Sequence, residues 1–287
     1  MKRLLILSGK GGTGKTTTAA AFIRFARAKA IADCDVDAPN PHLVTSMKTE
    51  PECSDFIGSE KACIQESLCG GCGICMEHCR FDAIEKTGTV CRIREYSCEG
   101  CGVCAHVCPA QAVSMNPDVA GTLALYREDT VFSTASLKMG RGNSGKLVTA
   151  VKLAMLKAAP ETKLAVIDGS PGIGCPVISS VSGTDLVLIV AEPSLSGLSD
   201  LKRLIQTAET FQTRTVVCVN KWDISPEITA SIEQFCREHT IDFVGKIPYD
   251  KAASSAINAG VSIADFDCPA RDALYEVFCS TMKVIQK

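Results

Sequence analysis

The chain has 287 residues, of which 46% are hydrophobic and 22% charged, so it can form a substantial core and wholesale disorder is excluded. Its net charge of −2 and its aromatic content of 5% give no argument for nucleic-acid binding, so we do not expect a nucleic-acid partner. Seventeen cysteines are the one anomaly in this composition.

The N-terminus predicts the compartment in which these cysteines act. The apolar run of residues 4–7 breaks at Ser8-Gly9-Lys10 and is too short for the core of a signal peptide. No stretch approaches the roughly 18 apolar residues of a membrane span. We therefore expect a cytoplasmic protein with no membrane partner, in a reducing compartment where clustered cysteines bind metal more often than they form disulfides.

The first apolar run predicts a buried strand, and a glycine-rich loop follows it. Residues 9–17 match G-x-x-x-x-G-K-[ST], and the alanine-rich residues 17–29 predict a helix. In this context backbone N–H groups surround phosphates, the lysine reaches the β and γ oxygens, and the threonine binds Mg²⁺. The sequence therefore predicts an ATP/ADP and Mg²⁺ site whose phosphate-binding residues are Gly11, Gly12, Thr13, Gly14, Lys15, Thr16 and Thr17.

Two later apolar segments end in aspartate. Residues 30–32 lead into Asp33, Asp35 and Asp37, and residues 163–167 lead into Asp168. Open α/β sheets bind their ligands at the carboxyl ends of strands, where these side chains would lie. Further strands at 185–190 and 216–219, alternating with helices, predict a mostly parallel sheet with helices on both faces.

Between these segments, residues 59–115 form a region rich in cysteine and glycine. Eight cysteines fall in two runs spaced C-x2-C-x2-C-x3-C, about 29 residues apart: Cys69, Cys72, Cys75 and Cys79, then Cys98, Cys101, Cys104 and Cys108. This spacing is typical of bacterial proteins with two [4Fe-4S] clusters. Zinc sites are the alternative, because CxxC pairs also bind Zn²⁺, but cysteines at a three-residue period favour clusters.

Two family resemblances follow from these motifs. Lys-Gly-Gly-Thr-Gly-Lys-Thr-Thr at residues 10–17 resembles the deviant phosphate loop of the MinD/ParA group of P-loop ATPases, and the cysteine region resembles a bacterial two-cluster ferredoxin. Together they imply an α/β P-loop fold with a mostly parallel, helix-flanked sheet, plus a small α+β ferredoxin-like insertion. The implied domains are an ATPase in two parts, 1–58 and 116–287, and an insertion at 59–115.

The MinD/ParA resemblance implies catalytic roles for Lys10, Lys15, Asp35 and Asp168. Lys10 would cross a homodimer interface and touch the partner's nucleotide, so ATP would lie at that interface. Asp35 would position the attacking water, and Asp168 would hold Mg²⁺ through water. Thr16 would complete the Mg²⁺ site with these two aspartates.

The same resemblance implies that Asn220 reads the adenine base and that Pro248 belongs to a loop closing over the nucleotide. The ferredoxin resemblance implies that the fourth cysteine of each run ligates the other cluster. One cluster would take Cys69, Cys72, Cys75 and Cys108, and the other Cys98, Cys101, Cys104 and Cys79. Arg80 replaces the proline usual after the first run, which leaves the ligand set intact.

Several features have default structural interpretations. We expect Cys175, in the glycine-rich segment after Asp168, to be a packed thiol, and Cys53, Cys63 and Cys91 to be small buried side chains. Residues 140–146 predict a turn at the start of a helix. The C-terminal residues 270–287 have the apolar spacing of a core-packing helix, which disfavours membrane targeting.

The favoured function is a slow, partner-stimulated ATPase that couples nucleotide state to electron transfer, or to maturation of a metallocentre, in an unknown redox or metalloprotein partner. An iron–sulfur or metal-cluster carrier is the alternative. A positioning ATPase in cell division or partition is weaker, because it would need a membrane helix or a basic DNA surface.

Overall fold

The structure is a computed structural model that describes residues 1–39, 47–159 and 161–287. Contacts between residues divide it into two compact units. The first comprises residues 1–54, 123–136 and 144–287, and the second comprises 55–122 and 137–143. The boundary between residues 54 and 55 falls inside the long strand β3 (Glu52–Ile64), and the boundary between residues 122 and 123 falls inside the long strand β6 (Val113–Arg127). The predicted boundaries at 59 and 115 fall inside the same two strands, whereas residues 137–143 group with the second unit.

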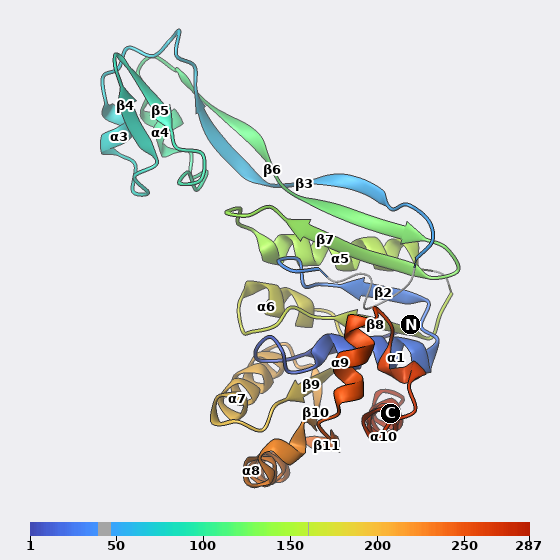
Figure 1. The fold of residues 1–287 in the computed structure, drawn as a ribbon. Helices are drawn as coiled ribbons and strands as arrows, with labels where there is room; N and C mark the ends of the chain where they lie inside the picture. Colours follow the sequence, from blue (N-terminus) through green and yellow to red (C-terminus); the bar gives the residue numbers. More distant parts are fainter. Residues whose placement is uncertain (40–46, 160) are drawn as a thin grey trace. The chain divides into compact units, whose positions relative to one another are not determined.

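A sheet in the order β11-β10-β9-β1-β8-β2-β7-β6-β3 organises the fold (Figure 1). Its remaining strands are β1 (Lys2–Leu7), β2 (Ala30–Asp33), β7 (Val131–Leu137), β8 (Leu164–Asp168), β9 (Leu186–Ala191), β10 (Arg214–Asn220) and β11 (Asp242–Ile247). Consecutive strands in the order from β11 to β7 pair in parallel. The prediction of a mostly parallel sheet is confirmed. Since both faces of its centre are covered, residues 4–7 of β1 are fully buried.

The first unit's helices are α1 (Lys15–Ala26), α5 (Ser144–Ala158), α6 (Cys175–Val181), α7 (Leu195–Thr210), α8 (Pro226–Glu238), α9 (Lys251–Asn258) and α10 (Pro269–Ile285), with short 3-10 turns η1 (Trp222–Ile224) and η2 (Ile263–Asp265). The connection from β1 to β2 runs in one direction along the sheet, and those from β7 through β10 run in the other. Because such crossovers are right-handed, α1 covers one face and α5 to α8 cover the opposite face. The switch in direction lies beside β1, where open α/β sheets bind ligands.

The C-terminal helix packs against α1 on its face of the sheet. Leu274 and Val277 are buried, and the ring of Phe278 meets that of Phe22 edge to face at 5.2 Å between centroids. The predicted core-packing role of residues 270–287 is therefore confirmed. The segment at 140–146 also behaves as predicted, since it ends in the first residues of α5.

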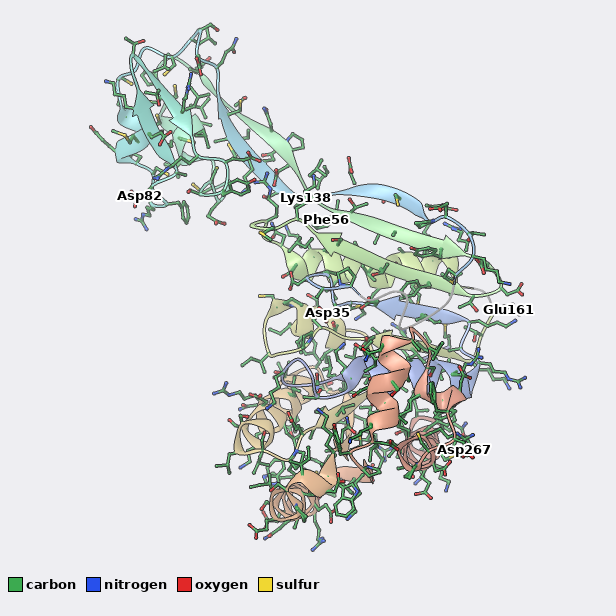
Figure 2. The ribbon with its side chains drawn as sticks, viewed as in Figure 1. Asp35, Phe56, Asp82, Lys138, Glu161 and Asp267 are labelled. Atoms are coloured by element: carbon green, nitrogen blue, oxygen red, sulfur yellow. The ribbon has the colours of Figure 1, made fainter. Side chains whose placement is uncertain are left out.

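The second unit contains two short helices, α3 (Ile74–Glu77) and α4 (Val103–Val107), and a hairpin of β4 (Ile84–Thr87) and β5 (Val90–Ile93). Its backbone repeats at the 29-residue offset of the sequence. Gly71 and Gly100 have φ of +64° and +71°, and a Cβ on either would lie 2.1 Å from a carbonyl oxygen. Asp82, labelled in Figure 2, and Gln111 share φ near +50° (+48° and +50°). The sequence repeat is therefore also a structural repeat.

Candidate functional site

The phosphate loop joins β1 to α1 at the switch point. Gly12 and Gly14 have φ of +80° and +95°, a backbone conformation that residues other than glycine rarely adopt. A Cβ on Gly14 would also lie 2.2 Å from Nδ2 of Asn220. A cavity opens over this loop and is lined by residues 10–18, Asp35, Asn220, Pro248 and Tyr249, among others. One cavity is thus lined by the phosphate loop, by Asn220, which we predicted to contact adenine, and by Pro248 of the predicted closing loop.

Lys15 and Asp168 form a buried ion pair beneath the loop. Lys15 Nζ lies 2.6 Å from Asp168 Oδ1 and 3.3 Å from the Thr16 hydroxyl. Burial opposes the lysine's charge, but Asp168, with smaller contributions from Asp35 and Asp33, raises the pKa of Lys15 above its ordinary value. A single nitrogen therefore contacts two of the three oxygen side chains predicted to bind Mg²⁺.

Asp35 follows the carboxyl end of β2 and is labelled in Figure 2. Its backbone N–H donates to Asp33 Oδ1 at 3.0 Å, and its carbonyl accepts from the N–H of Ala38 at 3.2 Å. Burial raises the pKa of its carboxyl, with Lys15 acting in the opposite direction and Asp168 adding to the rise. Asp33 itself is buried, whereas Asp37 is exposed.

Lys10 has partners within its own chain. Its Nζ lies 3.0 Å from Glu192 Oε2, and 3.4 Å from each hydroxyl of Ser194 and Ser196. These residues follow the carboxyl end of β9 or begin α7. The lysine therefore has to leave this group before it can reach another subunit.

The end of β10 braces the phosphate loop. Asn220 Nδ2 donates to the Thr13 carbonyl at 2.7 Å, and Lys221 Nζ donates to the Gly12 carbonyl at 2.9 Å. Sequence reasoning singled out Asn220 but missed Lys221. The available signal was its position directly after Asn220 at a strand end facing the loop.

One orphaned group in the loop fits a bound phosphate. The Thr13 hydroxyl is buried and has no hydrogen-bond partner within the described part of the chain. Buried polar atoms normally find a partner, and a phosphate oxygen would supply one. Thr16, Asp35 and Asp168 offer oxygen ligands, the type that Mg²⁺ prefers. The residues present fit both groups.

The segment after Asp168 is held by backbone contacts to the centre of the sheet. The N–H of Gly169 donates to the Ile6 carbonyl at 2.9 Å, and that of Gly172 donates to the Ser8 carbonyl at 3.0 Å. The segment ends at Cys175, which is exposed at the start of α6. Our expectation of a packed thiol there was wrong, because the first turn of α6 leaves its side chain at the surface.

The second unit contains two small cavities, lined by different sets of cysteines. One is lined by Cys69, Cys72, Cys75 and Cys108, with Cys91. The other is lined by Cys98, Cys101, Cys104 and Cys79. In each, three cysteines come from one run and the fourth from the other.

Backbone N–H groups point at several of these sulfurs. Ala83 N–H donates to Cys79 Sγ at 3.4 Å, and Ala112 N–H donates to Cys108 Sγ at 3.3 Å, one repeat later. Hydrogen bonds of this kind lower the pKa of Cys69, whereas burial raises that of Cys75 to about 12. Within residues 1–39, 47–159 and 161–287, no three His, Cys, Asp or Glu side chains are grouped to hold a single metal ion.

The other cysteines of this region do not share one environment. Cys53 and Cys63 are exposed on β3, so the expectation that they are buried was wrong. Cys63 points away from the face that buries its neighbour Ala62, whereas residues 52–55, which include Cys53, are exposed on both faces of the strand. Cys91 is buried, as expected, but it lies in the first cysteine cavity.

No helix in the described residues is long and apolar enough to cross a membrane.

Comparison with known proteins gives a family for most of the chain. The family of the CobQ/CobB/MinD/ParA nucleotide binding domain matches residues 4–263. An uncharacterised Methanocaldococcus jannaschii protein is 36% identical over 226 residues, covering 76% of this chain and 78% of that protein. An iron–sulfur cluster carrier protein of the same organism is 22% identical over 293 residues, covering 96% and 82%. The cell division ATPase MinD of Pyrococcus furiosus shares the fold, with a TM-score of 0.57, 16% identity and 99% of each chain covered.

Proposed function

Because the chain belongs to the CobQ/CobB/MinD/ParA nucleotide-binding family, we propose that it is an ATPase whose nucleotide state is coupled to two [4Fe-4S] clusters. Through them it would transfer electrons to a partner protein or help to mature that partner's metallocentre. The observation that carries the proposal is the pair of cavities that divide the eight cysteines four and four, in a chain that also has a complete phosphate loop.

The nucleotide chemistry assigns a task to each residue of the first site. The N–H groups of residues 11–17 and the Lys15 ammonium bind the phosphates, and Asn220 contacts the base beside Pro248. Thr16, Asp35 and Asp168 would hold Mg²⁺, which neutralises charge on the phosphates. Asp35 orients the attacking water. Lys10 would act on the nucleotide of a second copy, so the proposed active form is a homodimer in the cytoplasm.

The cysteine chemistry favours clusters over zinc. A [4Fe-4S] cluster has a different iron for each thiolate, so its four sulfurs surround a volume instead of meeting at one ion. Two cavities, each lined by four of the eight thiols, agree with that arrangement. The positive φ of Gly71 and Gly100 lets the backbone turn tightly beside the ligands. The proposed insertion at residues 59–115 is therefore a ferredoxin-like domain.

The chain order supports coupling between the two chemistries. Residues 137–143 belong to the second unit, and α5 begins directly after them. Helix α5 packs on α6, which follows the glycine-rich segment after Asp168. Lys152 on α5 donates to the carbonyls of Ser179 and Ser180 at 2.9 and 2.6 Å, near the end of α6. Movement of that segment on ATP hydrolysis would thus be transmitted to a helix continuous with the cysteine unit.

A cluster carrier is the second candidate, favoured by the similarity to the iron–sulfur cluster carrier protein. The two functions differ in where the cluster resides. In a redox ATPase both clusters stay in the chain, whereas a carrier gives up a labile cluster to an acceptor.

Anaerobic purification with quantification of iron, sulfide and zinc tests the proposal. About eight Fe per chain and an EPR signal after reduction are expected for two clusters. Cys79→Ser and Cys108→Ser should each lower the iron content to about four, and each should abolish a different EPR signal. Stoichiometric zinc without iron would overturn the assignment. Net transfer of iron to an apo-ferredoxin would favour the carrier.

Coupling needs its own measurement, because binding linkage is reciprocal. Cluster potentials measured with ADP and with a non-hydrolysable ATP analogue should differ. By the same linkage, the oxidised and reduced protein should differ in the ratio of their affinities for ADP and for the ATP analogue. Equal potentials together with equal affinity ratios would leave two independent activities in one chain and would refute the coupling.

A further inference from the structure

We propose that Lys221 is a positioning residue for the nucleotide phosphates. Together with Asn220 it holds two carbonyls of the phosphate loop, so that the N–H groups of the same peptide units face the phosphates. This inference rests on the proposed binding of a nucleotide by residues 11–17. It concerns a lysine outside the phosphate-loop motif, directly after strand β10.

Two consecutive side chains hold two consecutive carbonyls of the loop. Lys221 Nζ donates to the Gly12 carbonyl at 2.9 Å, and Asn220 Nδ2 donates to the Thr13 carbonyl at 2.7 Å. The backbone N–H of Lys221 donates to Asn220 Oδ1 at 3.0 Å, which fixes the orientation of the Asn220 amide. We call these two contacts from Asn220 and Lys221 the carbonyl clamp.

Peptide geometry determines which groups the carbonyl clamp orients. A trans peptide unit is planar, so its C=O and N–H groups point in opposite directions. Fixing the carbonyls of Gly12 and Thr13 therefore also fixes the N–H groups of Thr13 and Gly14. Within the described residues neither N–H donates to a protein group, and both Thr13 and Gly14 line the nucleotide cavity. These two N–H groups are thus oriented and available to phosphate oxygens.

The same part of the loop has further features that fit a bound anion. The buried hydroxyl of Thr13 has no hydrogen-bond partner in the described part of the chain. Gly12 and Gly14 flank it, and glycine loses more conformational freedom on ordering than any other residue. A clamp that orders the loop before the ligand binds therefore increases affinity. Lys221 itself has φ of +57°, an unfavourable conformation for lysine that persists where the surrounding structure imposes it.

A direct ion pair between the Lys221 ammonium and a phosphate is the competing role, and backbone dynamics separate the two. A clamp orders the loop before nucleotide binds, whereas a phosphate ligand does not. In the nucleotide-free protein, Lys221→Met should lower the NMR order parameters of the Thr13 and Gly14 N–H groups from about 0.85, typical of rigid backbone, to about 0.6 or below.

Binding measurements compare Lys221→Met with Lys246→Met as a matched control. Lys246 lies on the neighbouring strand β11, and its ammonium is 3.3 Å from Glu233 Oε1. ADP and adenosine each compete with a fluorescent ADP analogue for the full-length protein. Lys221→Met should weaken ADP binding about tenfold and leave adenosine binding unchanged, because adenosine has no phosphates to accept from the clamped N–H groups. Lys246→Met should bind both as wild type does.

The outcomes separate this inference from the proposed function. Wild-type protein that does not bind ADP would refute nucleotide binding itself. A Lys221→Met protein with unchanged affinity for ADP would refute the clamp and leave nucleotide binding in place. Weakened ADP binding with unchanged order parameters would make Lys221 a direct phosphate ligand, which also overturns the positioning role. Equal losses for ADP and adenosine, or an equal loss in Lys246→Met, would overturn it as well, because the effect would then not depend on the clamped N–H groups.

Discussion

The buried pair of Lys15 and Asp168 gives a prediction that separates its structural role from its role in nucleotide binding. Their side chains are 6% and 1% exposed, with 2.6 Å between Nζ and Oδ1. Lys15→Met removes the cation and leaves an unpaired carboxylate in the core, which should reduce the free energy of unfolding by about 3–5 kcal/mol. The double variant Lys15→Met/Asp168→Asn removes both charges and should regain most of that loss.

Urea unfolding in nucleotide-free buffer measures this effect, followed by fluorescence of Trp222, the only tryptophan in the chain. Trp222 lies in the first unit, in η1, with the Lys246 ammonium 4.8 Å from its ring centroid. ATP at 100-fold above its Kd should stabilise the wild type by about 2.7 kcal/mol and should stabilise neither variant. A double variant as unstable as Lys15→Met would refute the reasoning, because the cost would then not come from the unpaired charge.

The pH dependence of the same pair has a defined sign. The pKa of Lys15 is raised in the folded protein above 10.5, its ordinary value. The stability from the pair is therefore fully present below that ordinary value and is lost as the pH rises through the folded pKa. Asp168→Asn should weaken this alkaline loss, and an identical alkaline profile in the variant would contradict the assignment.

Three further predictions concern the nucleotide site. Gly14→Ala should weaken binding of a fluorescent ADP analogue more than tenfold (roughly 1.4 kcal/mol or more), because the new Cβ would clash with Asn220. Gly11→Ala is the control, since the space around its Cβ is open, and it should bind the analogue nearly as wild type does. Equal losses of affinity in the two variants would contradict this. Lys10→Ala should keep ATP binding but lose ATP-dependent dimerisation in light scattering, and a variant that still dimerises would exclude the interface role. Since burial raises the pKa of Asp35, its carboxyl should titrate above 3.8, the ordinary value for Asp, in the protein free of nucleotide and Mg²⁺, and an NMR titration midpoint at or below that value would contradict this.

Much of the fold followed from local sequence signals. The apolar runs before Gly9 and before Asp168 became the buried central strands β1 and β8, as expected for parallel strands that are covered on both faces. The phosphate loop was predictable because its backbone adopts positive φ at Gly12 and Gly14, a conformation that favours glycine. The grouping of residues 137–143 with the cysteine unit was not, since it depends on contacts made far along the chain.

Cysteine environments were less predictable than cysteine spacing. The two runs are defined by short intervals, which sequence shows directly. The exposure of Cys175, and the place of Cys91 beside Cys69, depend on which elements pack around each thiol. A lone cysteine is not part of a periodic pattern. The neighbouring sequence therefore does not indicate whether its side chain is buried, as is usual for cysteine, or exposed.

The ion-pair partners of the charged side chains in the nucleotide site were also not predictable from the sequence, and they affect the free energy of nucleotide binding. A P-loop motif identifies Lys15 as a phosphate ligand but says nothing of its partner without nucleotide. In the structure Lys15 is paired with Asp168 and Lys10 with Glu192. Under the proposed function, phosphate binding would exchange one anionic partner for another, so the net affinity would be a difference between two ion pairs. Release of Asp168 by Lys15 would free a carboxylate for Mg²⁺, while release of Lys10 would free the residue proposed to reach a second subunit. Nucleotide binding, metal binding and dimerisation would then depend on one another through these two exchanges, and weakening the Lys10–Glu192 pair by Glu192→Gln should promote dimerisation at lower ATP concentration.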